Sequence, residues 1–146
     1  MSDRDEAQKL QLAFSLHRSQ KFSEAAKLYR QIIKWNPRNP HALASLGVIE
    51  GANGNLIEAG HLVSRALSLQ PTNLQFIENH ATVQYRLGNY TAALESALKG
   101  CSIDKASKSL LHLSASSLFK LGRWQESLLQ FDKILALEPN HMAALN

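Results

Sequence analysis

Apolar residues recur along this chain at spacings of three and four, which is the spacing of one face of an α-helix. The clearest runs are Leu28, Ile32, Trp35 and Leu62, Ala66, Leu69. No segment sustains the alternation of apolar and polar residues that is typical of a half-buried strand. The pattern therefore predicts an all-helical protein.

The arrangement returns at a fixed interval. Pro37 and Pro71 are 34 residues apart, and Pro139 lies 68 residues beyond Pro71, with Lys105 at the place between them. The chain then divides without gaps into four repeats, which are residues 6–39, 40–73, 74–107 and 108–141. Residues 142–146 follow as the start of a fifth repeat or of a capping helix. A period of this length predicts stacked helix pairs, and we expect residues 1–146 to form a single domain of them.

Two columns of the aligned repeats hold small residues throughout. The first is Ala13, Gly47, Ala81, Ala115, and the second is Ala25, Ala59, Ala93, Ser127. Helices approach closely only where both carry little side chain, and a larger residue there would cost about 1–3 kcal/mol in strain. Both columns are therefore expected at helix–helix contacts.

Turn and cap residues mark the helix ends. A turn column, mostly glycine, lies in the middle of the repeat, where glycine suits a left-handed end of a helix: Gln20, Gly54, Gly88, Gly122. Large residues open the second helix directly afterwards: Phe22, Leu56, Tyr90, Trp124. Asn39, Asn73 and Ser107 are good N-caps for the next first helix, and Pro40 suits a first helical position.

These motifs resemble the tetratricopeptide repeat, whose length is also 34 residues. The second repeat reads LGVIEGANGN and then EAGHLVSRALSLQP, and the fourth reads LGRWQESLLQFDKILALEP. The resemblance implies an all-α fold, a right-handed superhelix of antiparallel helix pairs, and a non-enzymatic protein-interaction scaffold. The third repeat departs from the pattern at His80, Gly100 and Lys105, and a glycine inside a helix costs up to about 1 kcal/mol against alanine.

In proteins of this kind the first helices line a concave groove that binds a protein or peptide. The corresponding candidates here are Gln11, Phe14, His17, Arg18, His41, Ser45, Val48, Glu78, Asn79, Thr82, Tyr85, Arg86, His112, Ser116, Phe119 and Lys120. Arg18, Arg86 and Lys120 share a column near Phe14, Tyr85 and Phe119. This surface suits an extended peptide with acidic groups. The alternative is that the three cations only complement helix dipoles.

Two known variants of the groove are poorly matched. A carboxylate clamp of lysines and asparagines would need donors where this chain has Leu10, Gln11, Ser45, Gln75 and Asn79. An asparagine ladder that holds a peptide backbone is broken here into Gln11, Ser45, Asn79 and Leu113. The ladder still fits an alternative function, the substrate-recognition region of a larger bacterial enzyme, similar to glycosyltransferases or methyltransferases, whose catalytic domain lies beyond residue 146.

Composition excludes several classes of protein. The net charge of +4 comes from scattered basic residues and not from a basic block, which argues against nucleic acid as the partner. No apolar run reaches the length of a membrane span, and the charged start MSDRDEAQKLQ does not fit a signal peptide. One cysteine, Cys101, rules out an internal disulfide and fits a cytoplasmic protein.

Candidate chemistry is sparse. The six histidines include no pair at metal-binding spacing, and the serines from Ser107 to Ser117 lack the context of a nucleophile, so we expect no metal, no cofactor and no enzyme activity. Cys101 is expected to face inward and act as a small apolar residue. An apolar edge at the end of the chain predicts self-association through an uncapped last repeat: Phe131, Ile134, Leu135, Leu145.

Overall fold

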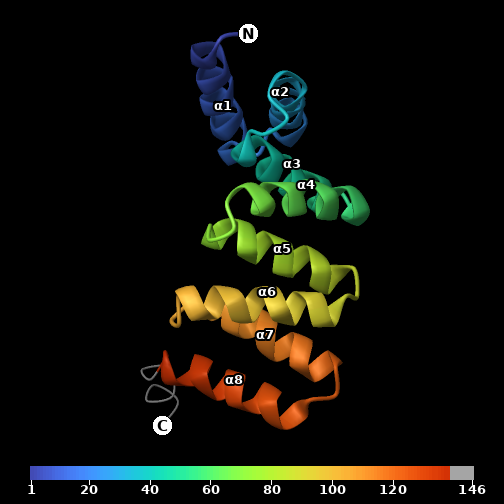
Figure 1. Cartoon of the computed structure of the whole chain (residues 1–146), viewed down its shortest axis with the longest axis vertical. Helices are drawn as coiled ribbons and strands as arrows, with labels where there is room; N and C mark the ends of the chain where they lie inside the picture. The colour runs from blue at the N-terminus through green and yellow to red at the C-terminus, as the bar shows by residue number, and fades with distance from the viewer. Residues whose placement is uncertain (139–146) are drawn as a thin grey trace. The chain divides into compact units, whose positions relative to one another are not determined.

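The computed structural model describes residues 1–138, and the regular structure within this range is α-helical. The chain divides into two compact units, which are unit 1, Met1–Pro71, and unit 2, from Thr72 onward. Unit 1 contains α1 (Asp3–Arg18), α2 (Phe22–Trp35), α3 (Pro40–Ala52) and α4 (Leu56–Leu69). Unit 2 contains α5 (Leu74–Arg86), α6 (Tyr90–Ile103), α7 (Lys108–Lys120) and α8 (Trp124–Ala136) (Figure 1).

Each unit consists of two helix pairs. In unit 1, α1 pairs with α2 and α3 with α4, while α2 packs against α3. In unit 2, α5 pairs with α6 and α7 with α8, while α6 packs against α7 and α5 lies beside α7 (Figure 1). One tight turn joins the helices of a pair, so α5 and α7, the two first helices of unit 2, run in the same direction.

The helix starts follow from their caps. The side chains of Asn39, Asn73 and Ser107 accept hydrogen bonds from backbone N–H groups in the first turns of α3, α5 and α7, as the sequence predicted. These helices begin at residues 40, 74 and 108, the predicted first residues of their repeats. The first helix is the exception. It begins at Asp3 rather than at Glu6, because Ser2 and Asp5 form a reciprocal capping box one turn earlier.

The small columns lie at the helix contacts, as predicted. The six alanines of the two columns are fully buried, and Gly47 is buried at a point where an added Cβ would lie 2.7 Å from Cγ2 of Val63. Ser127 stands in the alanine column of the fourth repeat, and its hydroxyl donates a 2.7 Å hydrogen bond to the carbonyl of Ala115. A serine fits this contact because its one polar group finds a partner on the facing helix.

The turn column adopts the left-handed conformation in all four repeats. Gly54, Gly88 and Gly122 have φ values of 87°, 83° and 77°, and Gln20 has a φ of 62°. Gln20 therefore carries the strain that the other three turns avoid with glycine. The large residues Phe22, Leu56, Tyr90 and Trp124 each begin the helix that follows.

Gly100 has a packing role that its position within a helix did not suggest. It is buried on α6, where an added Cβ would lie 2.6 Å from Cδ1 of Leu110 on α7 and 3.1 Å from Cγ2 of Ile77 on α5. The fully buried Leu110 thus occupies the space that a side chain at residue 100 would need. The helix propensity lost at Gly100 is offset by this close approach.

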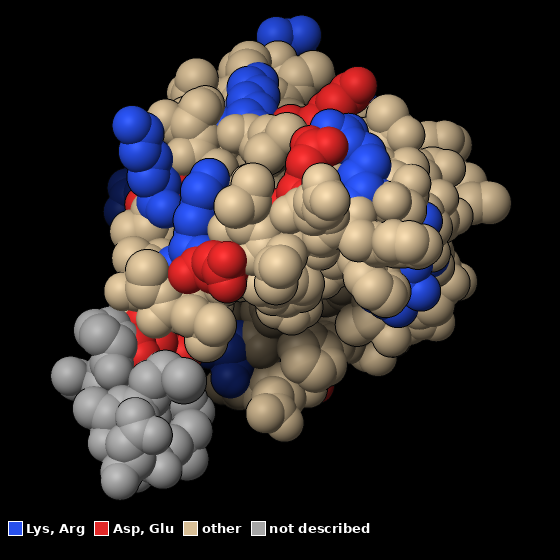
Figure 2. All heavy atoms as spheres, turned by 90° about the horizontal axis from the view of Figure 1, so that it is seen from below, with Lys and Arg blue, Asp and Glu red and all other residues tan. Residues whose placement is uncertain are grey.

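The helix α8 is largely exposed, and like α1 it has a single buried residue. Among its residues only Ser127 is buried, while Trp124 is 67% exposed and Leu128 62% exposed. Figure 2, which looks at the molecule from the end where α8 lies, shows broad uncharged areas between scattered charged side chains. In the predicted apolar edge, Leu135 is exposed and Phe131 and Ile134 are half-buried. Leu145 and the predicted start of a fifth helix at 142–146 lie outside the described residues, and self-association stays a prediction.

Candidate peptide-binding surface

In unit 1 the candidate residues are grouped around one buried tyrosine. Tyr29 of α2 is fully buried, and its hydroxyl lies 3.3 Å from Nδ1 of His17 on α1, with Ser45 of α3 nearby. The rings of Phe14 and Phe22 complete the cluster, with Phe14 6.2 Å from Tyr29 and Phe22 5.5 Å from His17. Burial raises the pKa of Tyr29 and lowers the pKa of His17. Tyr29 therefore links α1 and α2 beneath this surface.

The cluster changes the reading of three candidates. Phe14, His17 and Ser45 are half-buried, so they shape the surface and present only part of their area to a ligand. The other candidates of unit 1 are exposed: Gln11, Arg18, His41, Val48. The guanidinium of Arg18 lies 3.5 Å from the hydroxyl of Ser15, one turn back on its own helix.

In unit 2 the structure brings candidate residues of α5 and α7 into one open pocket. Its volume is about 460 Å³, and its lining residues are Glu78, Thr82, Lys108, Ser109, His112, Leu113, Ile134 and Glu138. Glu78, Thr82 and His112 were candidates from the sequence. Leu113 was considered only as a place in the broken asparagine ladder, and the remaining lining residues were not candidates. Lys108 and Ser109 belong to the first turn of α7, and Ile134 and Glu138 come from the second half of the repeat.

The far end of the same two helices is aromatic and basic. Tyr85 packs edge-on against Tyr90 with ring centroids 5.3 Å apart, and Phe119 is 59% exposed. Arg86 and Lys120 are exposed in the last turns of α5 and α7. These positions are compatible with both interpretations of the basic column, because a cation in the last turn stabilises the helix and each of the two cations directly follows an aromatic residue in the sequence.

The remaining candidates of unit 2 lie between these ends. Asn79 accepts a 3.1 Å hydrogen bond from the side-chain amide of Gln75. The hydroxyl of Ser116 lies 3.4 Å from Nδ1 of His112, whose ring packs edge-on against Phe131 at 5.9 Å. The Gln75–Asn79 and His112–Ser116 contacts each lie within one first helix, and they orient the side chains of Asn79 and Ser116 on the surface.

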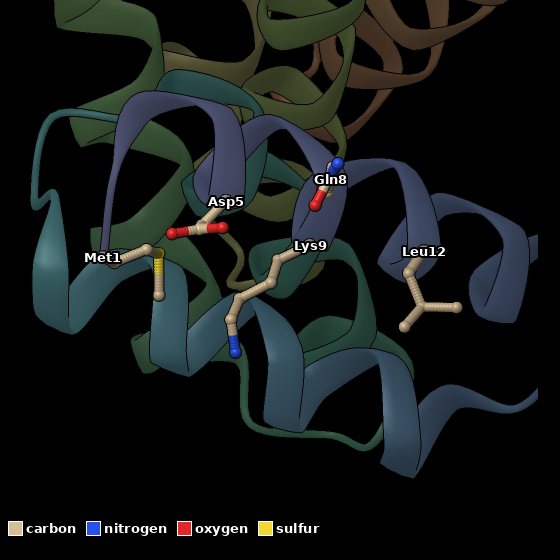
Figure 3. A pocket seen from close by; sticks show the side chains of 5 residues that line it. All are labelled: Met1, Asp5, Gln8, Lys9 and Leu12. Atoms are coloured by element: carbon tan, nitrogen blue, oxygen red, sulfur yellow. The ribbon is translucent and has the colours of Figure 1, made fainter.

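A second pocket of about 460 Å³ lies along α1, and none of the candidate residues lines it (Figure 3). Met1, Asp5, Gln8, Lys9 and Leu12 line it, and the ammonium of Lys9 donates a 2.9 Å hydrogen bond to Gln31. Leu12 is 53% exposed there, whereas Leu46, at the same place in the second repeat, is 5% exposed. Exposed Met1 and Leu12 thus lie among polar side chains, and the pocket is not part of the candidate surface.

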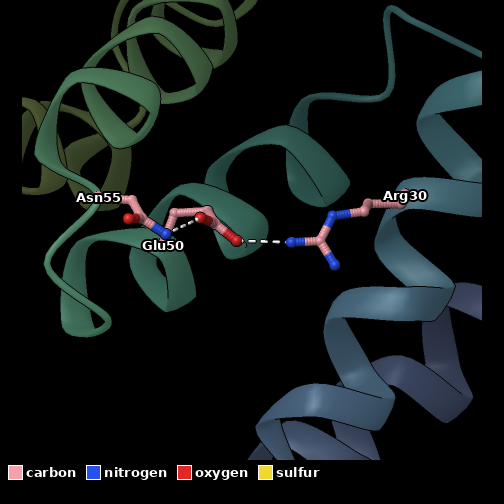
Figure 4. Close-up of polar contacts among 3 residues, drawn as sticks. All are labelled: Arg30, Glu50 and Asn55. Atoms are coloured by element: carbon pink, nitrogen blue, oxygen red, sulfur yellow. Dashed lines mark hydrogen bonds and ion pairs between the residues drawn. The ribbon is translucent and has the colours of Figure 1, made fainter.

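Another pocket, of about 410 Å³, lies between α2 and α3 beside a buried carboxylate. Glu50 is 7% exposed and accepts hydrogen bonds from Arg30 at 2.6 Å and from the side-chain amide of Asn55 at 2.7 Å (Figure 4). Both carboxylate oxygens of Glu50 are therefore satisfied within the protein. This arrangement is a structural link between α2 and α3.

Within residues 1–138, no group of three or more His, Cys, Asp and Glu side chains could hold a metal ion. In the same range, no helix is long and apolar enough to cross a membrane. Cys101 is half-buried, not fully inward-facing as expected, and burial raises the pKa of its thiol. A raised pKa disfavours the thiolate and therefore nucleophilic chemistry at this residue.

Two family models match the chain. The model described as anaphase-promoting complex, cyclosome, subunit 3 matches residues 52–134, which is more than half of the chain. The model described as tetratricopeptide repeat matches residues 10–73. Together the two matches extend from α1 to α8.

Curated relatives match over part of their length. Hsp70-Hsp90 organizing protein 2 of Arabidopsis thaliana is 28% identical over 94 residues, which are 64% of this chain and 16% of that protein. U-box domain-containing protein 70 of Oryza sativa subsp. japonica is 29% identical over 87 residues, 60% of this chain and 11% of that protein. The chain thus spans about a sixth or less of the length of these relatives.

Solved structures share the fold at low identity. MamA from Desulfovibrio magneticus RS-1 has a TM-score of 0.85 at 16% identity, over 95% of this chain and 78% of the other. YrrB, described as a TPR protein with an unusual peptide-binding site, has a TM-score of 0.84 at 18% identity, over 93% of this chain and 70% of the other. These likenesses confirm the predicted all-α solenoid of antiparallel helix pairs.

Proposed function

Because the chain belongs to the tetratricopeptide-repeat family, we propose that it is a protein-interaction scaffold whose first-helix surfaces hold an extended segment of another polypeptide. The observation that carries this proposal is the open pocket of unit 2, which residues of both first helices line. Glu78, Thr82 and His112 meet there from α5 and α7. A pocket of about 460 Å³ accommodates a few side chains of a bound segment.

The surface offers the two kinds of contact that such binding uses. Phe119 is largely exposed and can bury apolar area against a ligand, which makes it an anchor. Glu78 in the amino-terminal half of α5 and Lys120 at the end of α7 provide charges of both signs, and charges steer and orient a partner. Tyr85, held edge-on by Tyr90, adds a second aromatic wall.

Unit 1 contributes a firmer and less charged surface. The fully buried Tyr29 of α2 contacts His17 of α1, which favours a surface that is shaped before a ligand binds. Preorganisation of this kind reduces the entropy that binding costs. Exposed Val48 offers an apolar contact on α3. The partner, as proposed, is a protein or peptide.

The test is selection from a random library of displayed peptides, followed by affinity measurements on the best binders. Tyr85→Ala/Arg86→Glu removes one anchor and reverses one charge on α5. Leu98→Ala/Lys99→Glu makes the matched changes on the exposed side of α6 and serves as the control. We expect the α5 variant to weaken binding at least about tenfold and the α6 variant to leave it unchanged. Equal affinities for the two variants would remove the first-helix surface from the proposal.

Recognition of a substrate for a larger enzyme is a second use of the same surface. The curated relatives are several times longer than the matched region, so regions of this kind occur within longer proteins. Sequencing the gene beyond the codon for Asn146 distinguishes this role. A catalytic domain in the same reading frame supports it, and a stop codon contradicts it.

A further inference from the structure

We propose that the α5–α7 surface selects an extended segment in which basic and acidic side chains alternate. The inference rests on the proposed function and assigns a ligand class to it. Three parts of the surface carry it. We name them the acidic edge (Glu78, Lys108, His112, Glu138), the hydroxyl strip (Thr82, Ser116) and the cationic edge (Tyr85, Arg86, Phe119, Lys120).

The acidic edge lies along the amino-terminal halves of α5 and α7. Its two carboxylates, Glu78 and Glu138, face one pocket with a single ammonium, that of Lys108. Lys108 forms a 2.8 Å ion pair with Glu138. The carboxylate of Glu78 therefore gives this edge its negative charge, and a basic side chain of the ligand is the complementary group.

The hydroxyl strip crosses the middle of the two helices. Thr82 is exposed on α5 and Ser116 is half-buried on α7, and they occupy the same place in their repeats. Small side chains here leave room for a main chain to lie close to the helices. Their hydroxyl groups can both donate and accept hydrogen bonds, as the N–H and C=O groups of an extended segment require.

The cationic edge lies at the carboxyl-terminal ends of the same helices. Lys120 is exposed beside Phe119, and Arg86 follows Tyr85 on α5. Both cations belong to last turns, where the helix carbonyls also favour positive charge. An acidic side chain of the ligand is the complementary group, and the rings of Phe119 and Tyr85 can pack against its aliphatic part.

The separation of the edges matches an extended chain. Glu78 and Arg86 are eight residues apart on α5, which places their Cα atoms about 12 Å apart along the helix axis. Because α5 and α7 run in the same direction, each edge extends across both helices. A segment that crosses the helices along the hydroxyl strip points successive side chains to opposite sides. Alternate residues therefore reach the acidic edge, and the residues between them reach the cationic edge.

The same places in unit 1 hold different residues. Leu10 and Ala44 stand where Glu78 and His112 stand in unit 2, and Phe14 and Val48 replace the hydroxyl strip. Ala44 is 3% exposed, so α3 offers no side chain at that edge. The selectivity for alternating charge is therefore a property of unit 2 alone.

Two blocked synthetic peptides of about eight residues test the inference with the whole chain. In the first peptide Lys and Glu alternate strictly. In the second the same residues are arranged as a Lys block followed by a Glu block. Both peptides carry an N-terminal acetyl group and a C-terminal amide, so that no terminal charge contributes to binding. A tyrosine at the same place in each supplies an aromatic contact. Composition and net charge are equal, so a difference in affinity reports the order of the charges. We expect the alternating peptide to bind about tenfold more tightly.

Charge-reversal variants test whether the preference for the alternating peptide comes from the two charged edges. Glu78→Lys and Lys120→Glu each remove the opposition between the edges, and we expect each to lower the preference for the alternating peptide to less than about threefold. Glu95→Lys and Lys99→Glu make the same changes on the exposed side of α6 and should leave the preference intact. Circular dichroism of each variant checks that the helices are retained.

The outcomes separate the two proposals. If peptides selected from the library bind at α5 but the alternating and block peptides bind equally, the inference about charge order is wrong and the scaffold function stands. If no peptide binds with a dependence on Tyr85 and Arg86, the proposed function fails as well. A preference that persists in Glu78→Lys also contradicts the inference, because the charge then acts elsewhere.

Discussion

The junction of the first and second repeats and the junction of the third and fourth repeats fill the same space with the residue sizes reversed. In unit 1, Ile32 of α2 and Ala42 of α3 are fully buried. In unit 2 the residues at the same places are Gly100 of α6 and Leu110 of α7, and Leu110 lies over the glycine. The large residue of the pair belongs to the second helix of the earlier repeat in unit 1 (Ile32) and to the first helix of the later repeat in unit 2 (Leu110). The lesson is that the junction conserves total volume and leaves open which helix supplies it.

A second difference concerns polarity. Arg30 and Glu50 form an ion pair between α2 and α3, whereas leucines, Leu98 and Leu118, occupy the same places in unit 2. Glu50 is 7% exposed and Leu118 is 3% exposed, so both places are buried. A carboxylate is tolerated there because Arg30 and Asn55 satisfy it. The two junctions thus reach similar burial with different chemistry.

The largest expected effect tests the reversal of sizes. Leu110→Ala should destabilise unit 2 by about 2–5 kcal/mol, because it leaves a cavity over Gly100. Gly100→Ile should lower the free energy of unfolding of unit 2 by about 1–3 kcal/mol or more, because the isoleucine side chain would overlap Leu110. The double variant Gly100→Ile/Leu110→Ala reproduces the arrangement of unit 1, and we expect it to lose at least about 1 kcal/mol less than the sum of the two.

Each unit contains one of the two tryptophans, Trp35 and Trp124, which makes the measurement specific. Urea denaturation followed by the fluorescence of Trp124, in a Trp35→Phe background, reports on unit 2. If the two costs add without coupling, the volumes of residues 100 and 110 are independent and the comparison of junctions fails.

A smaller effect is expected at the ion pair. Glu50→Leu removes the acceptor for Arg30 and Asn55, and we expect a loss of about 1–2 kcal/mol, since the side chain of Arg30 is 56% exposed and can be solvated instead. Arg30→Leu/Glu50→Leu reproduces the chemistry of unit 2 and should return to within about 1 kcal/mol of the unmodified protein. Trp35 fluorescence in a Trp124→Phe background measures this. A double variant as unstable as Glu50→Leu would show that unit 1 requires the pair.

The smallest effect concerns pH. Burial lowers the pKa of His80 below its usual 6.5, and its Nδ1 lies 2.6 Å from the hydroxyl of Ser96. The unfolded chain then binds a proton more readily than the folded one, so stability is complete above about pH 6.5 and is lost as the pH falls below it. Because the ring is half-exposed, the slope should stay well under the limit of about 1.4 kcal/mol per pH unit for one proton.

His80→Leu, which introduces the residue type of Leu12 and Leu46, should reduce the pH dependence of unit 2. Urea midpoints measured from pH 7.5 to pH 5 through Trp124 test this. The signal of Trp35 serves as the internal control, because it follows unit 1, where burial lowers the pKa of His17 in the same way. An unchanged slope for unit 2 in the variant would assign the effect to other groups.

Much of the fold could be predicted from single columns of the repeat. Gly54, Gly88 and Gly122 are local signals, because a left-handed turn restricts the residue that adopts it. The buried alanines are equally local. Gly100 could not be interpreted in this way, since its reason lies in Leu110, ten residues later and on another helix. A column of aligned repeat positions shows which residue types occur at one position. Which residue contacts it on the neighbouring helix can be seen only in the structure.

The candidate surface shows the same limit. Glu78, Thr82 and His112 were found because they lie in the middle of first helices, where the family places its groove. Glu138 was missed because it follows the last helix and reaches the pocket only through the ion pair with Lys108. Tyr29 was missed because its role depends on its contact with His17 on another helix.

The pairing of Gly100 with Leu110 also determines which repeats can be neighbours. A copy of the second repeat placed after the third would set Ala42 against Gly100 and leave a hole, and the fourth repeat placed after the first would force Leu110 against Ile32. These modules are therefore not interchangeable despite their common length. Duplication or shuffling of a single repeat would have to be accompanied by a change in its neighbour. The contacts between repeats therefore restrict the order in which the repeats can follow one another.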